Sequence, residues 1–144
     1  MNFIIRECKI ADGPYIQQLN RRQMGYDFPL RETMKKLEKR LADPSQKIFV
    51  AEADEQVVGY IHLEDYDTLY APHMKNILGI ATARQYQRRG IGRALLSAAE
   101  NWARRTGAAG VRLVSGEGRK DAHKFYAVCG YDGGKKQINF KKIF

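Results

Sequence analysis

The spacing of apolar residues along the chain predicts an alternation of strands and helices. Apolar residues at every second position indicate strands, and apolar residues three or four positions apart indicate helices. Glycine, proline and aspartate mark where elements end. The expected strands are Asn2–Glu7, Lys47–Ala53, Gln56–Glu64, Lys75–Thr82, Gly110–Ser115 and terminal strands within Tyr131–Phe144. Two helices are expected to begin at Asp12-Gly-Pro14 and at Leu30. Two more are expected over Gly90–Thr106 and Arg119–Cys129.

The helix expected over Gly90–Thr106 has the strongest pattern in the chain. Its apolar residues recur at helical spacing, and Gly107 provides a stop signal at the end. Ile91, Ala94, Leu95, Ala98 and Trp102 share one face. We therefore expect an amphipathic helix over this range.

The order of the elements predicts the fold class. Strands interrupted by helices imply a layered α/β (α+β) architecture, in which a mixed sheet carries helices on both faces. A chain of 144 residues suits one domain, so we expect a single domain over residues 1–144.

Composition excludes several classes of protein and adds one clue. No apolar run is long enough to cross a membrane, and no secretory signal precedes the first strand, so we expect a cytoplasmic protein. The two cysteines, Cys8 and Cys129, form no CxxC pair, and the histidines lack metal-ligand spacing, so we expect no metal. A net charge of +9 favours an anionic partner, whether nucleic acid, anionic membrane or a phosphorylated small molecule.

The segment Ile80–Leu96 is the most informative stretch of the chain. A strand ends, a basic turn follows, and Gly90 and Gly92 open a helix whose first N–H groups have no partner within the helix. Such a helix end binds phosphate, and Arg88, Arg89 and Arg93 add positive charge. The segment is neither a GxGxxG fingerprint nor a P-loop. A helix that merely starts with glycine between solvated arginines is the other interpretation.

Two motifs resemble one known family. Gln87-Arg-Arg-Gly-Ile-Gly92 is similar to the Q/R-x-x-G-x-G/A signature of the GNAT superfamily of N-acetyltransferases. Downstream, Ala122–Tyr131 is similar to the A-x-x-F-Y-x-x-x-G-F/Y segment of that family, with Tyr126 and Gly130 in register. The order of the first elements also fits, so the resemblance spans nearly the whole chain and implies a GNAT-like fold.

The resemblance implies acetyl-CoA as the cosubstrate and an amine as the acceptor, which attacks directly in a ternary complex. The backbone of Ile80–Thr82 would pair with the pantetheine arm and the thioester carbonyl, and the turn and helix start would hold the pyrophosphate. By position in the motifs, the residues that would bind acetyl-CoA are Ile80, Ala81, Thr82, Gln87, Arg88, Arg89, Gly90, Ile91, Gly92, Arg93, Arg119 and Tyr126.

The resemblance also assigns the catalytic roles. Tyr126 would be the general acid that protonates the leaving thiolate, because a phenol stays protonated at pH 7. A base or a water relay is still needed, since an amine arrives as ammonium. Glu64, expected at the end of the third strand, is the first candidate. The others are Asp65, Asp67, His73 and Glu117.

The acceptor pocket of the family forms from the loop between the first two helices and the loop after the third strand. In this chain these loops contain Tyr26–Phe28 and Tyr66–Tyr70. The residues expected to bind the acceptor are Tyr26, Phe28, Asp65 and Tyr66, with the acidic residues attracting a cationic amine. Ordinary packing at the bases of the loops explains the aromatic residues equally well.

The sequence departs from the family pattern at two positions. Arg119 stands where many members have asparagine, so the usual amide contact to the coenzyme is lost. Val114 occupies the place on the fifth strand where enzymes that acetylate protein N-termini often carry a glutamate. This second departure argues against an N-terminal acetyltransferase.

Two other functions are compatible with the sequence. The first is a GNAT-like protein that binds acyl-CoA without turnover. The second is a basic nucleic-acid-binding protein, but the chain has no helix-turn-helix, RRM, KH or zinc motif, so we do not expect nucleic acid as the partner. Terminal strands at an exposed edge could also pair two copies into a homodimer.

Overall fold

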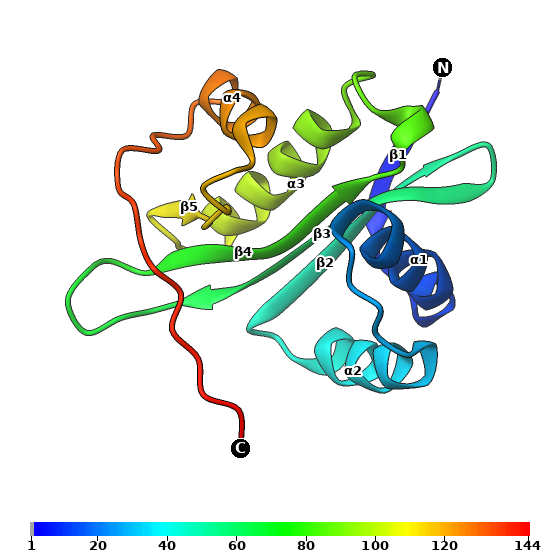
Figure 1. Cartoon of the computed structure of the whole chain (residues 1–144), viewed down its shortest axis with the longest axis horizontal. Coiled ribbons are helices and arrows are strands. Elements are labelled where there is room, and N and C mark those ends of the chain that lie inside the picture. Colours follow the sequence, from blue (N-terminus) through cyan, green and yellow to red (C-terminus); the bar gives the residue numbers. More distant parts are fainter. Residues whose placement is uncertain (1) are drawn as a thin grey trace. The chain divides into compact units, whose positions relative to one another are not determined.

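A five-stranded sheet forms the centre of the first part of the chain, and its strands lie side by side in the order of the sequence (Figure 1). The structure is a computed structural model, and it describes residues 2–144. The strands are β1 (Ile4–Glu7), β2 (Gln46–Ala53), β3 (Gln56–Tyr66), β4 (Met74–Thr82) and β5 (Gly110–Arg112). The helices are α1 (Gly13–Met24), α2 (Leu30–Ala42), α3 (Ile91–Arg105) and α4 (Lys120–Val128), with short 3-10 turns η1 (Ile10–Asp12) and η2 (Arg84–Tyr86).

The sheet is mixed, as the order of the elements predicts. β1 to β4 pair antiparallel, and β5 joins β4 in parallel after the crossover through α3. The hairpin between β2 and β3 turns through Asp54 and Glu55, which have positive φ angles of 51° and 61°. Two successive residues with positive φ are typical of the tight turn that matches the twist of the flanking strands.

The two faces of the sheet are covered by different helices (Figure 1). Val50 and Tyr60 belong to a buried apolar cluster with Ile16 and Leu19 of α1 and Leu37 of α2. The opposite face packs on α3, and it allows a close approach at one position. A Cβ atom on Gly59 would lie 3.1 Å from the carbonyl oxygen of Ala81 and 3.2 Å from Ile91 of α3. Glycine at this position therefore lets α3 lie close to the sheet.

Local signals in the sequence explain where the first helix begins and ends. Pro14 stands in the first turn, where its missing N–H is not needed, and Gly25 ends the helix in the left-handed conformation. Asp12 is buried just before the helix, and both of its carboxylate oxygens accept hydrogen bonds from Arg6, at 2.8 and 3.0 Å. This ion pair ties the start of α1 to β1.

The chain divides into two compact units, one up to Leu113 and one over Val114–Phe144. The second unit contains α4 and a segment without regular structure after it. That the whole chain folds as one domain stays a prediction.

The terminal strands predicted after Tyr131 were wrong, and the predicted fifth strand was too long. Residues 131–144 have no strand, and Ile138 and Phe140 are 79% and 86% exposed. The apolar spacing there is strand-like, but a strand needs a ladder partner, which this segment lacks in the described chain. β5 is also shorter than expected, because its pairing with β4 ends at Arg112. Val114, expected on this strand, lies beyond it in the second unit and is 65% exposed.

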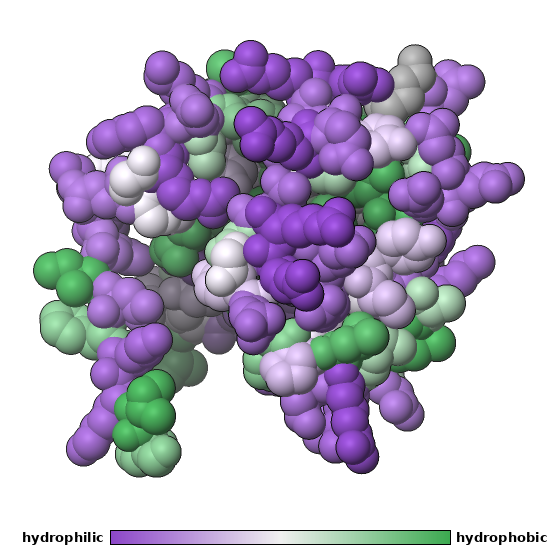
Figure 2. Space-filling view, turned by 45° about the vertical axis from the view of Figure 1, so that its right-hand side comes forward, coloured by the Kyte–Doolittle hydropathy of each residue, from purple (hydrophilic) through white to green (hydrophobic). Residues whose placement is uncertain are grey.

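Within residues 2–144, no helix is long and apolar enough to cross a membrane, and no group of three or more potential metal-ligating side chains occurs. Both cysteines are free thiols; Cys8 is buried and Cys129 is half-buried. Hydrophilic side chains cover most of the face shown in Figure 2, with hydrophobic side chains in scattered groups.

Candidate functional site

One edge of β4 is open over most of its length. β5 pairs with β4 only over Met74–Asn76, and no other described strand pairs with β4 on that side. Over Ile77–Thr82, the backbone groups that point away from β3 therefore have no ladder partner. A bulge at Leu78 accompanies this divergence, since Ile77 and Gly79 have register partners on β3 and Leu78 has none.

The open strand leads directly into the basic turn before α3. Arg88 and Gly90 both have positive φ angles, 62° and 87°. Where residues with a left-handed backbone conformation alternate with residues of ordinary conformation, successive backbone N–H groups point to the same side. The resulting concavity suits an anion. Gly90 is the N-cap of α3, and no side chain caps the helix there. The N–H groups of the first helical turn therefore remain available to a ligand.

Side chains fasten this turn to the rest of the sheet. The amide of Gln87 donates a hydrogen bond to the carbonyl oxygen of Thr82, at 3.0 Å. The hydroxyl of Tyr86 donates to a carboxylate oxygen of Asp54 in the β2–β3 hairpin, at 2.7 Å. The Arg89 guanidinium lies 6.0 Å from the centre of the Tyr86 ring, within reach of a cation–π contact. The hairpin thus fixes the turn that carries the arginines.

An open strand, a basic turn and the start of a helix follow one another in this chain, and comparison with known families places these residues within one family match. Residues 14–131 match the model of the acetyltransferase (GNAT) family. The chain belongs to the GNAT family of acetyltransferases. The family assignment made from the two motifs is confirmed, and so is the predicted fold class of a mixed sheet flanked by helices.

Individual relatives of this GNAT acetyltransferase are distant. An uncharacterized N-acetyltransferase, YhdJ of Bacillus subtilis (strain 168), is 44% identical over 50 residues, a match that covers 35% of each chain. The structure of AAC(6')-Iy with the bisubstrate analogue CoA-S-monomethyl-acetylneamine has a TM-score of 0.87 at 16% identity, covering 100% of both chains. An aminoglycoside acetyltransferase from an uncultured soil metagenomic sample, in complex with sisomicin, has a TM-score of 0.83 at 20% identity, covering 99% of this chain and 96% of that one.

The residues predicted to bind acetyl-CoA fall into both units of the GNAT acetyltransferase. Ile80–Thr82 end β4, and Gln87–Gly90 form the exposed turn. Gly92 and Arg93 follow in the first turn of α3. Ile91 is only 1% exposed, so its side chain belongs to the core and only its backbone can face a ligand.

Arg119 and Tyr126 belong to the second unit. Arg119 is exposed at the N-cap of α4. Tyr126 is half-buried within α4, with its ring 5.4 Å from that of Phe125 and 6.2 Å from that of Tyr131. Burial raises the pKa of the Tyr126 phenol, although the charge of Arg119 acts in the opposite direction. The phenol therefore keeps its proton at neutral pH, as a general acid requires.

The acidic residues after the third strand are placed differently from the prediction. β3 continues to Tyr66, so Glu64 does not end the strand, and Asp65 and Tyr66 belong to the strand rather than to the loop. Strand residues alternate between faces, so Glu64 and Asp65 point in opposite directions. One carboxylate oxygen of Glu64 accepts a hydrogen bond from the Asn76 amide at 3.0 Å.

Asp65 is committed to the opposite face of the sheet. Its carboxylate accepts a hydrogen bond from Lys75 and lies 3.2 Å from Nε2 of His73. Partial burial opposes the charge on Asp65, but these two partners lower its pKa below the ordinary value. Lys75 is 2% exposed, and its ammonium lies 4.0 Å from the centre of the Trp102 ring of α3. Asp65 therefore balances a buried cation.

The remaining candidates for a base and for the acceptor site lie at the surface. Glu117 pairs with Lys136 at 3.2 Å, and Asp67 is exposed. Tyr26 and Phe28 are 63% and 41% exposed in the connection between α1 and α2. Their exposure leaves both aromatic side chains free to contact a ligand.

The structure also shows polar residues near the site that the sequence analysis missed. Asn76 on β4 donates a hydrogen bond to Glu64 and accepts one from Arg112 on β5. Asp54 accepts a hydrogen bond from the hydroxyl of Tyr86. The only signal in the sequence was a polar residue inside an apolar strand, as at Asn76. The identity of its partners depends on strand register, which the sequence does not specify.

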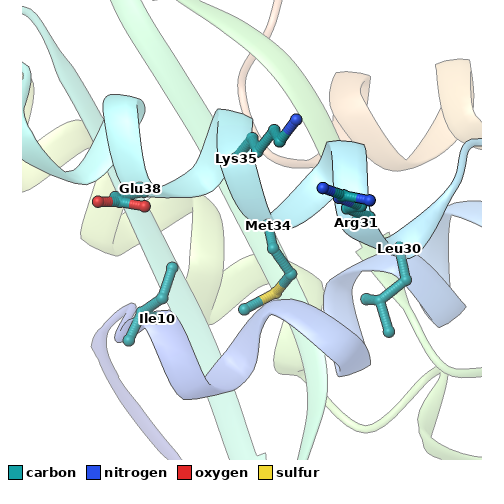
Figure 3. Close-up of a pocket in the computed structure, with 6 residues that line it drawn as sticks. All are labelled: Ile10, Leu30, Arg31, Met34, Lys35 and Glu38. Carbon is teal, nitrogen blue, oxygen red and sulfur yellow. The ribbon is translucent and has the colours of Figure 1, made fainter.

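The described chain also has an open hollow of about 480 Å³ that is lined by other residues (Figure 3). Ile10 of η1 lines it, together with residues of α2, among them Leu30 and Met34. No residue predicted for the donor or acceptor site contributes to this hollow.

Proposed function

We propose that this GNAT acetyltransferase transfers the acetyl group of acetyl-CoA to an amine. The observation that carries the proposal is the open edge of β4 over Ile77–Thr82, which runs directly into the basic turn and the uncapped start of α3. A pantetheine arm has amide groups that can pair with a free strand edge, and a pyrophosphate suits a helix N-terminus. The neighbour AAC(6')-Iy, which binds an analogue containing CoA, supports the same ligand here.

The residues of the turn suit an anionic donor. Coenzyme A carries about four negative charges, and Arg88, Arg89 and Arg93 lie around the turn and the first helical turn. Apart from its chain neighbours, no heavy atom of the described residues lies within 4 Å of the position of a Cβ on Gly90, so a phosphate can approach the backbone there. Gln87 would hold the end of β4 while the outward backbone groups of Ile80–Thr82 bind the pantetheine and the thioester.

The reaction needs one base and one acid. Glu64 takes a proton from the ammonium of the acceptor through intervening water and frees the nitrogen lone pair. The nitrogen attacks the thioester carbonyl, a C–N bond forms and the C–S bond breaks. Tyr126 donates its phenolic proton to the departing sulfur. The nitrogen, positively charged after the attack, loses a second proton that restores the Tyr126 phenol through water, and Glu64 releases its own proton to solvent. A Tyr126 pKa raised by burial keeps this proton in place until the thiolate leaves.

Binding of the donor is the first test. We expect acetyl-CoA to bind with micromolar affinity by calorimetry, and Arg88→Ala to weaken it about tenfold through loss of a charge-assisted contact. Arg21→Ala, at an exposed position on α1, is the matched control and should bind like the wild type. Absence of binding at millimolar acetyl-CoA would contradict the proposal.

Turnover is the second test and separates an enzyme from a protein that only binds acyl-CoA. With a panel of amines, release of the CoA thiol should depend on Tyr126, and Tyr126→Phe should lower kcat on the order of a hundredfold. The affinity for acetyl-CoA should change much less. Tyr15→Phe on α1 controls for loss of a hydroxyl at the surface. Equal kcat in Tyr126→Phe and the wild type would remove Tyr126 from the reaction.

A further inference from the structure

Three polar side chains form a continuous row across β3, β4 and β5. The strand register places Glu64 beside Asn76 and Asn76 beside Arg112. The Asn76 amide nitrogen donates to Glu64 at 3.0 Å, and its carbonyl oxygen accepts from Nη1 of Arg112 at 2.6 Å. Neighbouring residues in register point to the same face, so the carboxylate and the guanidinium lie on one side of the sheet.

The row lies on the face that carries α1 and α2. Tyr60 and His62 precede Glu64 at alternate positions of β3, and Tyr60 packs in the cluster with α1 and α2. Asp65 and Lys75, by contrast, point to the α3 face and neutralise each other. The row therefore contributes one carboxylate and one guanidinium to the α1–α2 face, where α2 also brings the charge of Arg40 near His62.

The row holds its two charges apart rather than joining them. Asn76 uses both ends of its amide, one toward each charged group, and Arg112 takes part in no ion pair within the part of the chain that the structure describes. The Tyr66 ring lies 4.2 Å from the Arg112 guanidinium and supports its flat side. The guanidinium thus keeps N–H donors for a ligand in a fixed orientation.

The row also stands where the two strands separate. Asn76 and Arg112 form the last pair of the β4–β5 ladder, and β4 continues alone from Ile77 toward the proposed thioester position. Strand residues rise by about 3.3 Å each, so Ile80 follows Asn76 by about 13 Å along β4. An acceptor in contact with this row would approach the open edge of β4 from the α1–α2 face.

From these contacts we infer that the acceptor is an amine that also carries an anionic group, a carboxylate or a phosphate, at some distance from the reacting nitrogen. The inference rests on the proposed function. Arg112 binds the anion through two parallel hydrogen bonds, and the amine end of the acceptor extends from there along β4 toward the thioester, with the Glu64 carboxylate attracting the ammonium. A polycation without an anion, such as a polyamine, leaves Arg112 facing positive charge. Arg112 is thereby a specificity-determining residue, held in position by Asn76 and Tyr66.

Matched pairs of acceptors test the inference on the wild-type protein. Each pair consists of an amine and its anionic analogue: cadaverine and lysine for the carboxylate, glucosamine and glucosamine 6-phosphate for the phosphate. We expect kcat/KM to be at least about tenfold higher for the anionic member of one pair. The pair that shows the preference identifies the anion. A preference for the anion-free member in both pairs would overturn the inference.

Substitution of Arg112 assigns the preference to this side chain. Arg112→Gln should lower kcat/KM for the anionic acceptor about tenfold more than for its anion-free partner, and Arg112→Lys should retain part of the preference. Arg21→Gln, a surface control on α1, should retain all of it. Equal losses of kcat/KM for both members of a pair would mean that Arg112 has only a structural role. Thermal unfolding would then show a lower Tm for the Arg112 variants.

The failure of this inference and the failure of the proposed function give different results. Binding of the four acceptors is also measured by calorimetry in the presence of CoA, without turnover. If no amine is acetylated but the anionic member of a pair binds and Arg112→Gln abolishes its binding, the proposed reaction fails and the site stands. If amines are acetylated without any anion preference, the reaction stands and the inference fails.

Discussion

At the scale of single residues, His62 is a half-buried base that the fold keeps neutral. It lies on β3, and its Nε2 is 2.6 Å from the side-chain oxygen of Gln46. Burial, aided by the nearby charge of Arg40, lowers its pKa from 6.5 to about 4. Its hydrogen-bond partner is an amide oxygen, which accepts from the neutral ring without requiring a charge.

Stability should therefore fall as the pH drops below 6.5. Between pH 6.5 and about 4 the unfolded chain protonates its histidine while the folded chain does not, so protons favour unfolding in that window. The loss at pH 4 is up to about 3 kcal/mol. Denaturant unfolding at pH 7 and at about pH 4.5 measures it.

A glutamine at position 62 can keep the hydrogen bond to Gln46 without a titrating ring, so His62→Gln should flatten the pH dependence. His123→Gln provides the control, because His123 lies in the second unit and contacts the Gly116 carbonyl. The same acid sensitivity in His62→Gln as in the wild type would assign the effect to other groups. The carboxyl groups with lowered pKa values, such as Asp65, destabilise the fold only at still lower pH.

At the scale of elements, the β2–β3 hairpin supports the turn before α3. Asp54 accepts the hydroxyl hydrogen bond of Tyr86, which in turn stands beside Arg89. If this contact orients the turn for a pyrophosphate, Tyr86→Phe should raise the KM for acetyl-CoA severalfold and leave kcat nearly unchanged, because a single exposed hydrogen bond contributes about 1 kcal/mol.

An acetyl donor without phosphates serves as the control for the hairpin contact. S-acetylpantetheine lacks the pyrophosphate, so its KM should be the same for Tyr86→Phe and the wild type. A rise in KM for both donors would show that the substitution disturbs the pantetheine site or the fold. Tyr15→Phe, on α1, controls for the loss of a hydroxyl.

Most elements could be predicted because their signals are local. The helix α3 follows from its apolar face and flanking glycines, and the hairpin follows from the tight Asp54-Glu55 connection. The errors concern properties that depend on distant partners. The strand-like spacing after Tyr131 has no ladder to join, and the contact between Asn76 and Arg112 depends on a parallel register set by the α3 crossover. The residues proposed to bind the donor come from the motifs, whereas the Glu64–Asn76–Arg112 row became visible only through the register.

At the scale of the whole molecule, the net charge of +9 should influence how the donor binds. A basic protein attracts a polyanion over distances comparable to the Debye length. This length falls from about 10 Å to about 3 Å between about 0.1 M and about 1 M salt. We expect the Kd for acetyl-CoA to rise severalfold over this range in calorimetry, while the Kd for S-acetylpantetheine, which carries no phosphate, should barely change. An equal rise for both ligands would contradict an electrostatic origin.

The open edge of β4 has a consequence for self-association. Unpaired N–H and C=O groups along a strand offer a template to a strand from another molecule, the step that begins edge-to-edge aggregation. The bulge at Leu78 interrupts the even spacing of these groups, so an incoming peptide strand loses register after a few residues. A slender ligand needs only the short stretch beyond the bulge. The bulge at Leu78 thus disfavours edge-to-edge association and leaves this strand edge free for a small molecule.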